Sequence, residues 1–305
     1  LAIPATPLGY NLQVSAARWP DKPACLFLGH TLSYAALDRQ AQALAAWLQA
    51  KGVAAGDRVA LFLQNCPQFL VAFYAAMKAG AVVVPVNPMN RADELGHCLA
   101  DAQATVAVCA ADLAGIVAQA DAALPPAQRL RQVVVARYAD ALPDGIDPAL
   151  GVPAAMRDWL LAEAPLPEGL PLTRWADALA QGASLPFTPP AVSADDLALL
   201  PYTSGTTGLP KGCMHTHRTL MANAASGQWG WSGAETVSLT VVPMFHITGM
   251  VYGVLAPVYA GSTSVLMPRW DRELAARLIA RHRVTHWTCI PTMIIDLFGS
   301  PNYAG

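Results

Sequence analysis

Short apolar segments typical of β-strands alternate along the chain with segments in which apolar residues recur at helical spacing. One example is the strand expected at 57–63, which is followed by a helix at 67–80 and by another strand at 82–88. The alternation continues to residue 135 and resumes over 197–298. Strands and helices that alternate at this spacing form parallel sheets covered by the helices. The pattern therefore predicts an α/β fold with mostly parallel sheets.

Two proline-rich stretches interrupt this alternation. The first, residues 140–171, contains six prolines, and we expect it to run over the surface with one short helix at 153–162. The second, residues 183–194, precedes the point where the alternation resumes, and changes of domain commonly fall in linkers of this kind. We therefore expect two layered α/β subdomains, formed by residues 1–190 and 191–305.

The composition limits the classes of function open to the chain. Its 305 residues carry a net charge of −2 without a basic tract, so nucleic acid is not an expected partner. Six scattered cysteines without a Cys-x-x-Cys pair are typical of reduced thiols in a cytoplasmic protein. The longest apolar stretch, 241–260, is interrupted by His246, Gly249, Gly253 and Pro257. No integral membrane segment is therefore expected.

The most specific local feature is the stretch 200–212, which reads LPYTSGTTGLPKG. Its last ten residues hold four hydroxyl side chains, three glycines and one lysine. Glycines let backbone N–H groups approach a ligand, hydroxyls donate to phosphate oxygens, and lysine adds a mobile positive charge. A Walker A loop is excluded, because Pro210 precedes Lys211 and Gly212 stands where that motif has Ser or Thr. The stretch predicts a loop that binds a polyphosphate, and a plain surface turn is the competing interpretation.

The order of residues in this loop resembles the signature phosphate loop of the adenylate-forming superfamily. That superfamily includes acyl-CoA synthetases, peptide-synthetase adenylation domains and luciferases. Residues 32–37, 72–88, 243–249 and 285–291 are similar to further motifs of the superfamily, in the same order. The form at 243–249, Pro-Met-Phe-His-Ile-Thr-Gly, is similar to that of fatty-acyl- and aryl-CoA ligases. The resemblance thus covers essentially the whole chain.

This resemblance implies a reaction in two steps. A carboxylate attacks the α-phosphorus of ATP to give an acyl-adenylate and pyrophosphate, and a thiol, usually that of coenzyme A, then displaces AMP. The implied ligands are ATP, Mg²⁺, coenzyme A and a medium- or long-chain fatty acid or an aryl carboxylate. The resemblance assigns the β- and γ-phosphates to Thr203, Ser204, Gly205, Thr206, Thr207, Gly208 and Lys211, with Thr207 also at the metal.

The resemblance also implies a catalytic role for His246. It places this residue between the adenylate and the acyl pocket, where it orients the carboxylate, whereas an apolar neighbourhood alone favours a histidine of the core. The following helix would line the acyl pocket with Met250, Val251, Val254 and Leu255. At helical spacing these four residues are equally consistent with a plain core face.

The chain departs from the superfamily near its end. No Tyr-Gly-x-Thr-Glu or Thr-Gly-Asp segment occurs, so we expect the N-terminal part of a larger ligase without its small C-terminal domain. Two alternatives stay open: an adenylation domain that loads a carrier protein, and a non-catalytic module that binds a nucleotide or an acyl group. The expected partners are a small carboxylate, ATP and coenzyme A. A homodimer and loose attachment of a cytoplasmic protein to a membrane surface also stay open.

Overall fold

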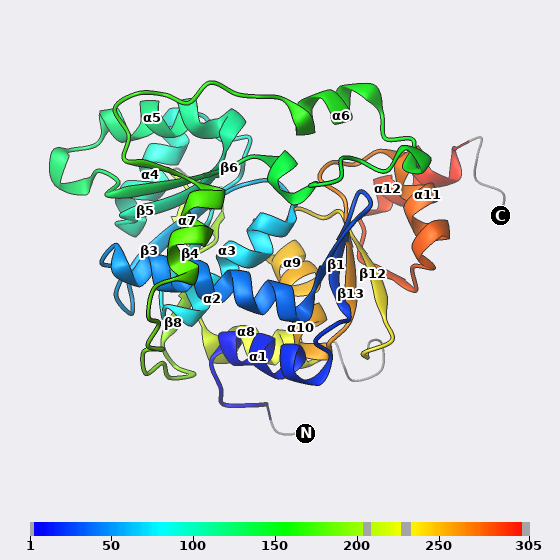
Figure 1. Ribbon diagram of the computed structural model, residues 1–305, viewed down its shortest axis with the longest axis horizontal. Helices are drawn as coiled ribbons and strands as arrows, with labels where there is room; N and C mark the ends of the chain where they lie inside the picture. The colour runs from blue at the N-terminus through cyan, green and yellow to red at the C-terminus, as the bar shows by residue number, and fades with distance from the viewer. Residues whose placement is uncertain (1–2, 204–208, 227–232, 301–305) are drawn as a thin grey trace.

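The structure is a computed structural model that describes residues 3–203, 209–226 and 233–300. Within this part of the chain, the larger sheet has the strand order β11-β8-β4-β3-β5-β6-β7 (Figure 1). All neighbouring strands are parallel except β11 and β8. The strands are β3 (Arg58–Phe62), β4 (Val82–Pro85), β5 (Val106–Ala110), β6 (Gln132–Ala136), β7 (Leu172–Arg174), β8 (Leu197–Leu199) and β11 (His215–Thr216).

A smaller sheet has the order β14-β12-β13-β1-β2, and a separate ribbon pairs β9 with β10. In the smaller sheet only β1 and β2 are antiparallel. Its strands are β1 (Pro23–Phe27), β2 (His30–Ser33), β12 (Val237–Thr240), β13 (Thr263–Leu266) and β14 (His286–Trp287), and the ribbon consists of β9 (Tyr202–Thr203) and β10 (Lys211–Gly212).

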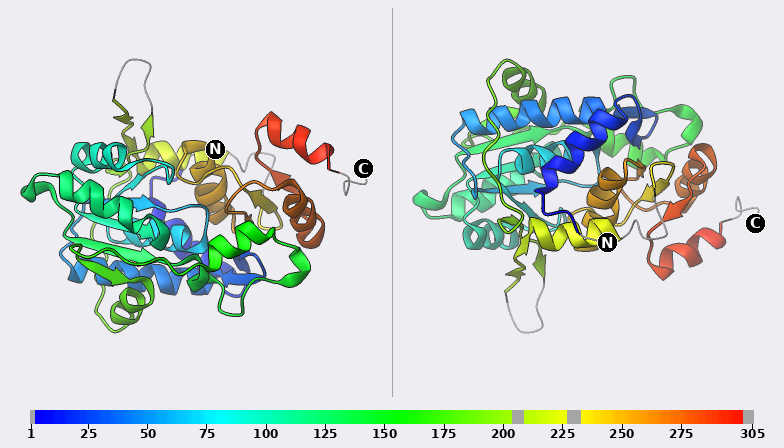
Figure 2. Two further views of the ribbon diagram at one scale, coloured as in Figure 1. Left: turned by 90° about the horizontal axis from the view of Figure 1, so that it is seen from above. Right: turned by 90° about the horizontal axis from the view of Figure 1, so that it is seen from below.

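Helices cover both faces of the larger sheet, with α4 and α5 on one side and α2, α3 and α7 on the other (Figures 1 and 2). A π-helical turn, Val251–Leu255, joins α9 to α10. The helices are α1 (Leu8–Arg18), α2 (Tyr34–Ala50), α3 (Pro67–Lys78), α4 (Ala92–Ala102), α5 (Ala114–Ala123), α6 (Ala154–Leu161), α7 (Trp175–Ala183), α8 (His217–Ser226), α9 (Ile247–Met250), α10 (Ala256–Ala260), α11 (Arg272–His282) and α12 (Pro291–Phe298).

Strand β3 shows why the sheet needs cover on both faces. Successive side chains of a strand point to opposite faces. Val59 and Leu61 join the core cluster that contains α2 and α3, whereas Ala60 and Phe62 join the cluster beneath α4 and α5. Apolar residues at the four consecutive positions 59–62 therefore fit a central parallel strand, which is buried on both sides.

Helix α3 lies near the middle of the molecule and packs against α2 and the larger sheet (Figure 1). All twelve of its residues are buried, as expected for a helix that is apolar on every side. The Tyr74 hydroxyl donates to the carbonyl of Val254 at 3.1 Å, which joins α3 to the π-helical turn. One continuous core cluster contains residues of both sheets, including Leu61 of β3 and Val265 of β13.

The predicted α/β class with mostly parallel sheets is confirmed. Each sheet takes strands from both sides of residue 190: β1 and β2 pair in the sheet that holds β12 to β14, and β8 and β11 extend the sheet built around β3. The boundary predicted at 190–191 therefore does not separate the two sheets. The reason is that strands pair across long sequence separations, which the order of elements along the chain does not show.

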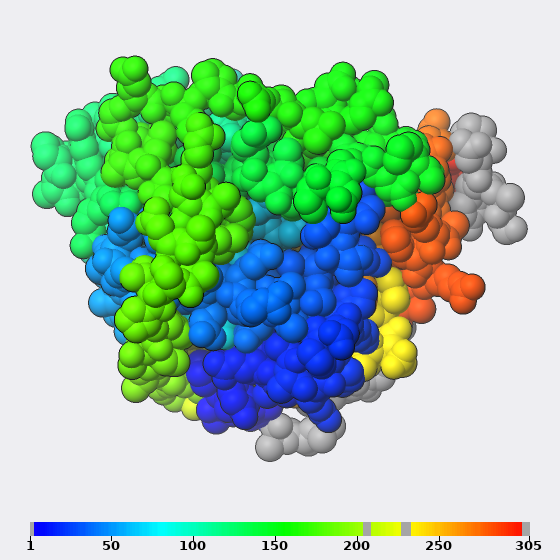
Figure 3. Space-filling view, in the orientation of Figure 1, coloured from blue at the N-terminus to red at the C-terminus, as the bar shows by residue number. Residues whose placement is uncertain are grey.

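Several local predictions differ in detail from the structure. The alternation over 197–298 includes short strands expected at 212–215 and at 285–290. The first is divided between β10 and β11, and the second is only the two residues of β14. The proline-rich segment 140–171 runs over the surface, where it forms part of the green outer layer in Figure 3, and it contains helix α6 as expected. Among the described residues, no helix combines the length and the apolar character needed to cross a membrane.

Candidate nucleotide and carboxylate site

The β9–β10 ribbon carries the two described ends of the predicted phosphate loop. Lys211 is paired with Thr203, and Gly212 with Tyr202, so two of the predicted phosphate-binding residues lie directly opposite each other. Both Thr203 and Lys211 are exposed, and the ribbon projects from the body of the molecule (Figure 2). The other predicted phosphate-binding residues (Ser204, Gly205, Thr206, Thr207 and Gly208) lie outside the described part of the chain.

His246 is exposed and caps the N-terminus of α9. Its Nδ1 accepts a hydrogen bond from the Thr248 amide at 3.3 Å. In the neutral imidazole the proton therefore lies on Nε2, which can donate. The exposure argues against the alternative of a core histidine, and the catalytic role of His246 stays a prediction.

Buried Asn65, just after β3, holds the segment that leads to His246. Its side-chain oxygen accepts from the Met244 amide at 2.8 Å, and its amide nitrogen donates to the Val242 carbonyl at 3.2 Å. Both contacts fix the backbone immediately before the histidine. Sequence reasoning did not single out Asn65, although a polar residue at the carboxyl end of a parallel strand is a known signal for a site.

A cavity of about 450 Å³ brings the ribbon and His246 together. Thr203 and Pro210 lie on its wall on the ribbon side, and Phe245, His246 and Ile247 line it from the start of α9. The residues that follow β4 and β8 also border it. It therefore opens beyond the carboxyl ends of neighbouring strands, which is where open α/β sheets bind ligands.

The helical segment after His246 separates its side chains into two faces. Met250, Val251, Val254 and Leu255, which were predicted to line an acyl pocket or to belong to the core, are buried in the main core cluster. The opposite face lines cavities instead. Thr248 and Tyr252 border a small cavity of about 10 Å³. Tyr252 also lines a larger one of about 660 Å³, which is lined by Ser226, Ser238, Leu239, Tyr252, Ala256, Pro257, Ser262, Thr285, His286, Trp287 and Thr288.

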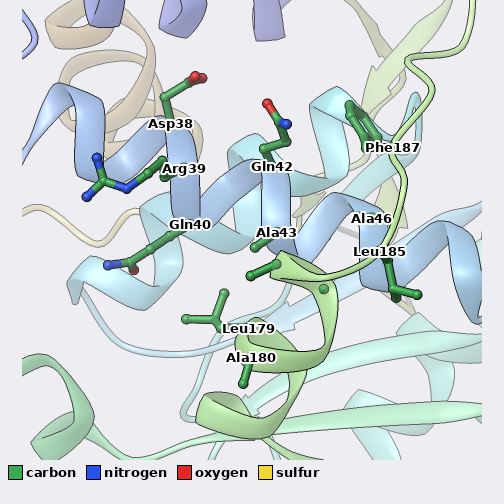
Figure 4. A pocket seen from close by; sticks show the side chains of 12 residues that line it. Asp38, Arg39, Gln40, Gln42, Ala43, Ala46, Leu179, Ala180, Leu185 and Phe187 are labelled. Carbon is green, nitrogen blue, oxygen red and sulfur yellow. The ribbon is translucent and has the colours of Figure 1, made fainter.

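A cavity of about 500 Å³ between α2 and α7 lies apart from these residues (Figure 4). Leu179 of α7 and Leu185 and Phe187 of the following segment form its apolar part, and Asp38, Arg39 and Gln40 of α2 border it. None of the predicted site residues lines it. Its lining, among the described residues, contains no histidine, cysteine, serine or threonine.

Neither the cysteines nor a metal cluster supplies a reactive group among the described residues of the site. Burial raises the pKa of Cys98 to about 12, so this thiol, which borders the 450 Å³ cavity, is neutral at physiological pH. All six cysteines are free. The part of the chain described here contains no cluster of three His, Cys, Asp or Glu side chains suited to a metal, and Thr207, the predicted metal ligand, lies outside it.

Comparison with known proteins identifies the class to which this fold and site belong. The model of the AMP-binding enzyme family matches residues 12–304. The chain therefore belongs to the family of AMP-binding enzymes.

Individual relatives agree with this assignment. The chain is 31% identical over 312 residues to a long-chain-fatty-acid–CoA ligase of Bacillus subtilis, covering 99% of this chain and 53% of the relative. It is 33% identical to 4-coumarate–CoA ligase 2 of Oryza sativa, with 94% of this chain and 48% of the relative covered. A solved fatty acyl CoA synthetase of Mycobacterium tuberculosis superposes with a TM-score of 0.73 at 26% identity, covering 96% of this chain and 51% of that one. The chain thus spans about half the length of these relatives.

Proposed function

We propose that this chain takes part in the ATP-dependent activation of a carboxylic acid, first to an acyl-adenylate and then to an acyl-CoA thioester. The observation that carries the proposal is the 450 Å³ cavity that joins the phosphate-loop ribbon to His246. Membership of the AMP-binding family supports it, as do relatives named for ligation of fatty and aromatic acids to CoA.

The phosphate-loop residues would hold the leaving pyrophosphate. Thr203, Lys211 and the loop residues between them, including Ser204, Gly205, Thr206, Thr207 and Gly208, supply amides, hydroxyls and one cation. A carboxylate oxygen forms a bond to the α-phosphorus as the bond from that phosphorus to pyrophosphate breaks. Phosphoryl-type transfers of this kind depend on positioning and on neutralising the charge of the leaving group. Mg²⁺, when bound with the nucleotide, would add to that neutralisation, and its requirement stays a prediction.

His246 would orient the carboxylate. With Nδ1 occupied by the Thr248 amide, its Nε2–H is the group that can donate to a carboxylate oxygen. In the second step the sulfur of coenzyme A would attack the acyl carbon, AMP would leave with the shared oxygen, and the thiol would lose its proton. No covalent bond to the protein is needed in either step.

The acyl group would extend along α9 and the π-helical turn. Tyr252 of this segment lines the 660 Å³ cavity, which Trp287 also lines. We propose a medium- or long-chain fatty acid as substrate, following the names of several relatives, with an aryl carboxylate as the alternative. A cytoplasmic location, attachment to a membrane surface and a homodimer stay predictions.

The direct test is release of pyrophosphate from Mg-ATP in the presence of carboxylic acids from acetate to palmitate and of benzoate. Release that depends on one class of acid supports the proposal and identifies the acid. ATP binding without release for any acid would instead favour the alternative of a non-catalytic nucleotide-binding module.

A further inference from the structure

Helix α4 contacts both strands of the phosphate-loop ribbon through side chains one turn apart. His97 Nε2 lies 2.7 Å from the carbonyl oxygen of Pro210, just before Lys211. Because a carbonyl oxygen can only accept, His97 donates and carries a proton on Nε2. Four residues further along, the Asp101 carboxylate accepts from the Tyr202 hydroxyl at 2.6 Å. Residues at this spacing share one face of a helix.

The ring of Tyr202 completes this contact. A Cβ atom at position 212 would lie 3.2 Å from Cζ of Tyr202, so the absence of a side chain on Gly212 leaves room for the ring to cross the ribbon. The His97 ring meets the Tyr202 ring edge to face, with centroids 6.2 Å apart and an interplanar angle of 83°. His97, Tyr202 and Asp101 therefore form one connected layer between α4 and the ribbon.

The ribbon needs such an anchor because it is short. Among the described residues two pairs form it, Thr203 with Lys211 and Tyr202 with Gly212, and two-stranded ribbons are marginally stable without further packing. Helix α4, in contrast, is fixed to the larger sheet by Leu95 and Leu99, which are buried in the core cluster with Phe62 and Val86. The contacts of α4 with the ribbon can therefore hold the ribbon in a fixed position relative to the larger sheet.

We propose that His97 and Asp101 are positioning residues for the phosphate loop. They act through Pro210 and Tyr202, and they hold both ends of the loop in register beside the cavity that contains His246. This inference rests on the proposed function, since it assumes that the loop binds the phosphates of ATP. Neither side chain needs to touch the nucleotide.

Paired variants separate a positioning role from a merely structural one. Asp101→Leu and Tyr202→Phe each remove the hydroxyl–carboxylate bond, whereas Asp101→Asn keeps an acceptor oxygen. We expect the first two to raise the Kd for ATP about tenfold, the effect of losing one good hydrogen bond, and the Asn variant to restore most of the affinity. His97→Phe should weaken ATP binding, whereas His97→Gln keeps a donor and should restore it. The Kd for the carboxylate should not change.

A second readout reports on the ribbon without any nucleotide. Amide hydrogen exchange at Tyr202, Thr203, Lys211 and Gly212 should become about tenfold faster in Asp101→Leu and in Tyr202→Phe, because a lost anchor opens the local structure. The double variant should show no more effect than either single variant, since both break the same bond.

These experiments distinguish failure of the positioning role from failure of the proposed function. If the parent protein binds ATP, and the variants bind it equally well with unchanged exchange in the ribbon, the positioning role is overturned and the proposed function stands. If the parent protein does not bind ATP, the proposed function fails together with any role of α4 in nucleotide binding. Faster exchange combined with weaker ATP binding, both restored by Asp101→Asn, supports the inference.

Discussion

Lys211 is the described residue whose charge matters most to the proposed nucleotide site. We expect Lys211→Ala to weaken ATP binding at least about tenfold, because a hydrogen bond to a charged group contributes about 1.5–3 kcal/mol. The melting temperature should not change, since the side chain is exposed. Titration calorimetry measures the affinity, and Lys51→Ala, at an exposed lysine beside Trp47 of α2, is the matched control. Unchanged affinity in Lys211→Ala would remove the phosphate-binding role.

His246 combines two roles that one substitution can separate. Asparagine is a good N-cap residue, so His246→Asn should keep the cap of α9, and with it the melting temperature, while it removes the imidazole. We expect carboxylate-dependent release of pyrophosphate to fall about a hundredfold, a size typical for a lost catalytic donor, with ATP affinity unchanged. An unaltered rate would return His246 to a purely structural role.

Buried His217 makes stability depend on pH. Burial lowers its pKa from 6.5 to about 4, and its Nδ1 accepts from the Leu8 amide at 3.2 Å. Between pH 6.5 and pH 4 the unfolded chain binds a proton at His217 that the folded chain does not. The contribution of neutral His217 to the free energy of unfolding is therefore fully present above pH 6.5 and is lost as the pH falls toward 4. At pH 5 the loss should be about 2 kcal/mol.

Chemical denaturation at pH 7.5 and pH 5 measures this loss. His217→Asn keeps an acceptor for the Leu8 amide but does not titrate, so its stability should fall by about 2 kcal/mol less than that of the parent over this range. Equal pH dependence of the two proteins would assign the effect to other groups.

At the scale of single elements, the start of α9 depends on a close approach of two backbones. A Cβ atom on Gly249 would lie 2.1 Å from the carbonyl oxygen of Pro243, so Gly249→Ala forces the backbone before His246 to move. We expect a loss of about 1–3 kcal/mol, as for other overpacked sites. In contrast, Gly115→Ala in α5, where a Cβ meets nothing within 4 Å, should gain about 0.5–1 kcal/mol. Equal unfolding free energies for the two variants would contradict the close approach.

Most elements could be predicted from the sequence because local chemistry specifies them. Aspartate is a favoured N-cap residue, and Asp271 caps α11 with its carboxylate accepting from the Leu274 amide at 2.8 Å. The pairing of β9 with β10 could not be predicted, because two-residue strands are too short for an alternation pattern and their pairing depends on the residues that face them. The contact of His97 with Pro210 spans 113 positions and has no local signal.

At the scale of the whole molecule, the alternation of strands and helices was enough to predict the α/β class. It could not show that β1 pairs with β13 or that Asn65 holds Met244, 179 positions away. Such pairings depend on which apolar faces meet in three dimensions. The candidate site also depends on the three-dimensional fold. The motifs at 200–212 and 243–249 supplied its candidate residues, but only the fold shows that Thr203 and His246 line one cavity.

Each sheet contains strands from both sides of residue 190, and this arrangement predicts how the molecule unfolds. Because one core cluster joins both sheets, we expect a single cooperative transition, for which the calorimetric and van't Hoff enthalpies agree. Differential scanning calorimetry checks this. Two separate transitions, with proteolysis first at 183–194, would instead support independent subdomains on either side of residue 190.

Activation through an adenylate requires that a carboxylate oxygen becomes bonded to the α-phosphorus of ATP. Isotope transfer tests it most directly: the protein is supplied with Mg-ATP, coenzyme A and a carboxylic acid labelled with oxygen-18 in its carboxylate, and the AMP formed is analysed by mass spectrometry. The proposed reaction predicts one labelled oxygen in each AMP, because the oxygen that joins acyl carbon to phosphorus leaves with AMP. AMP without the label, or ADP as the only product, would contradict activation through an adenylate.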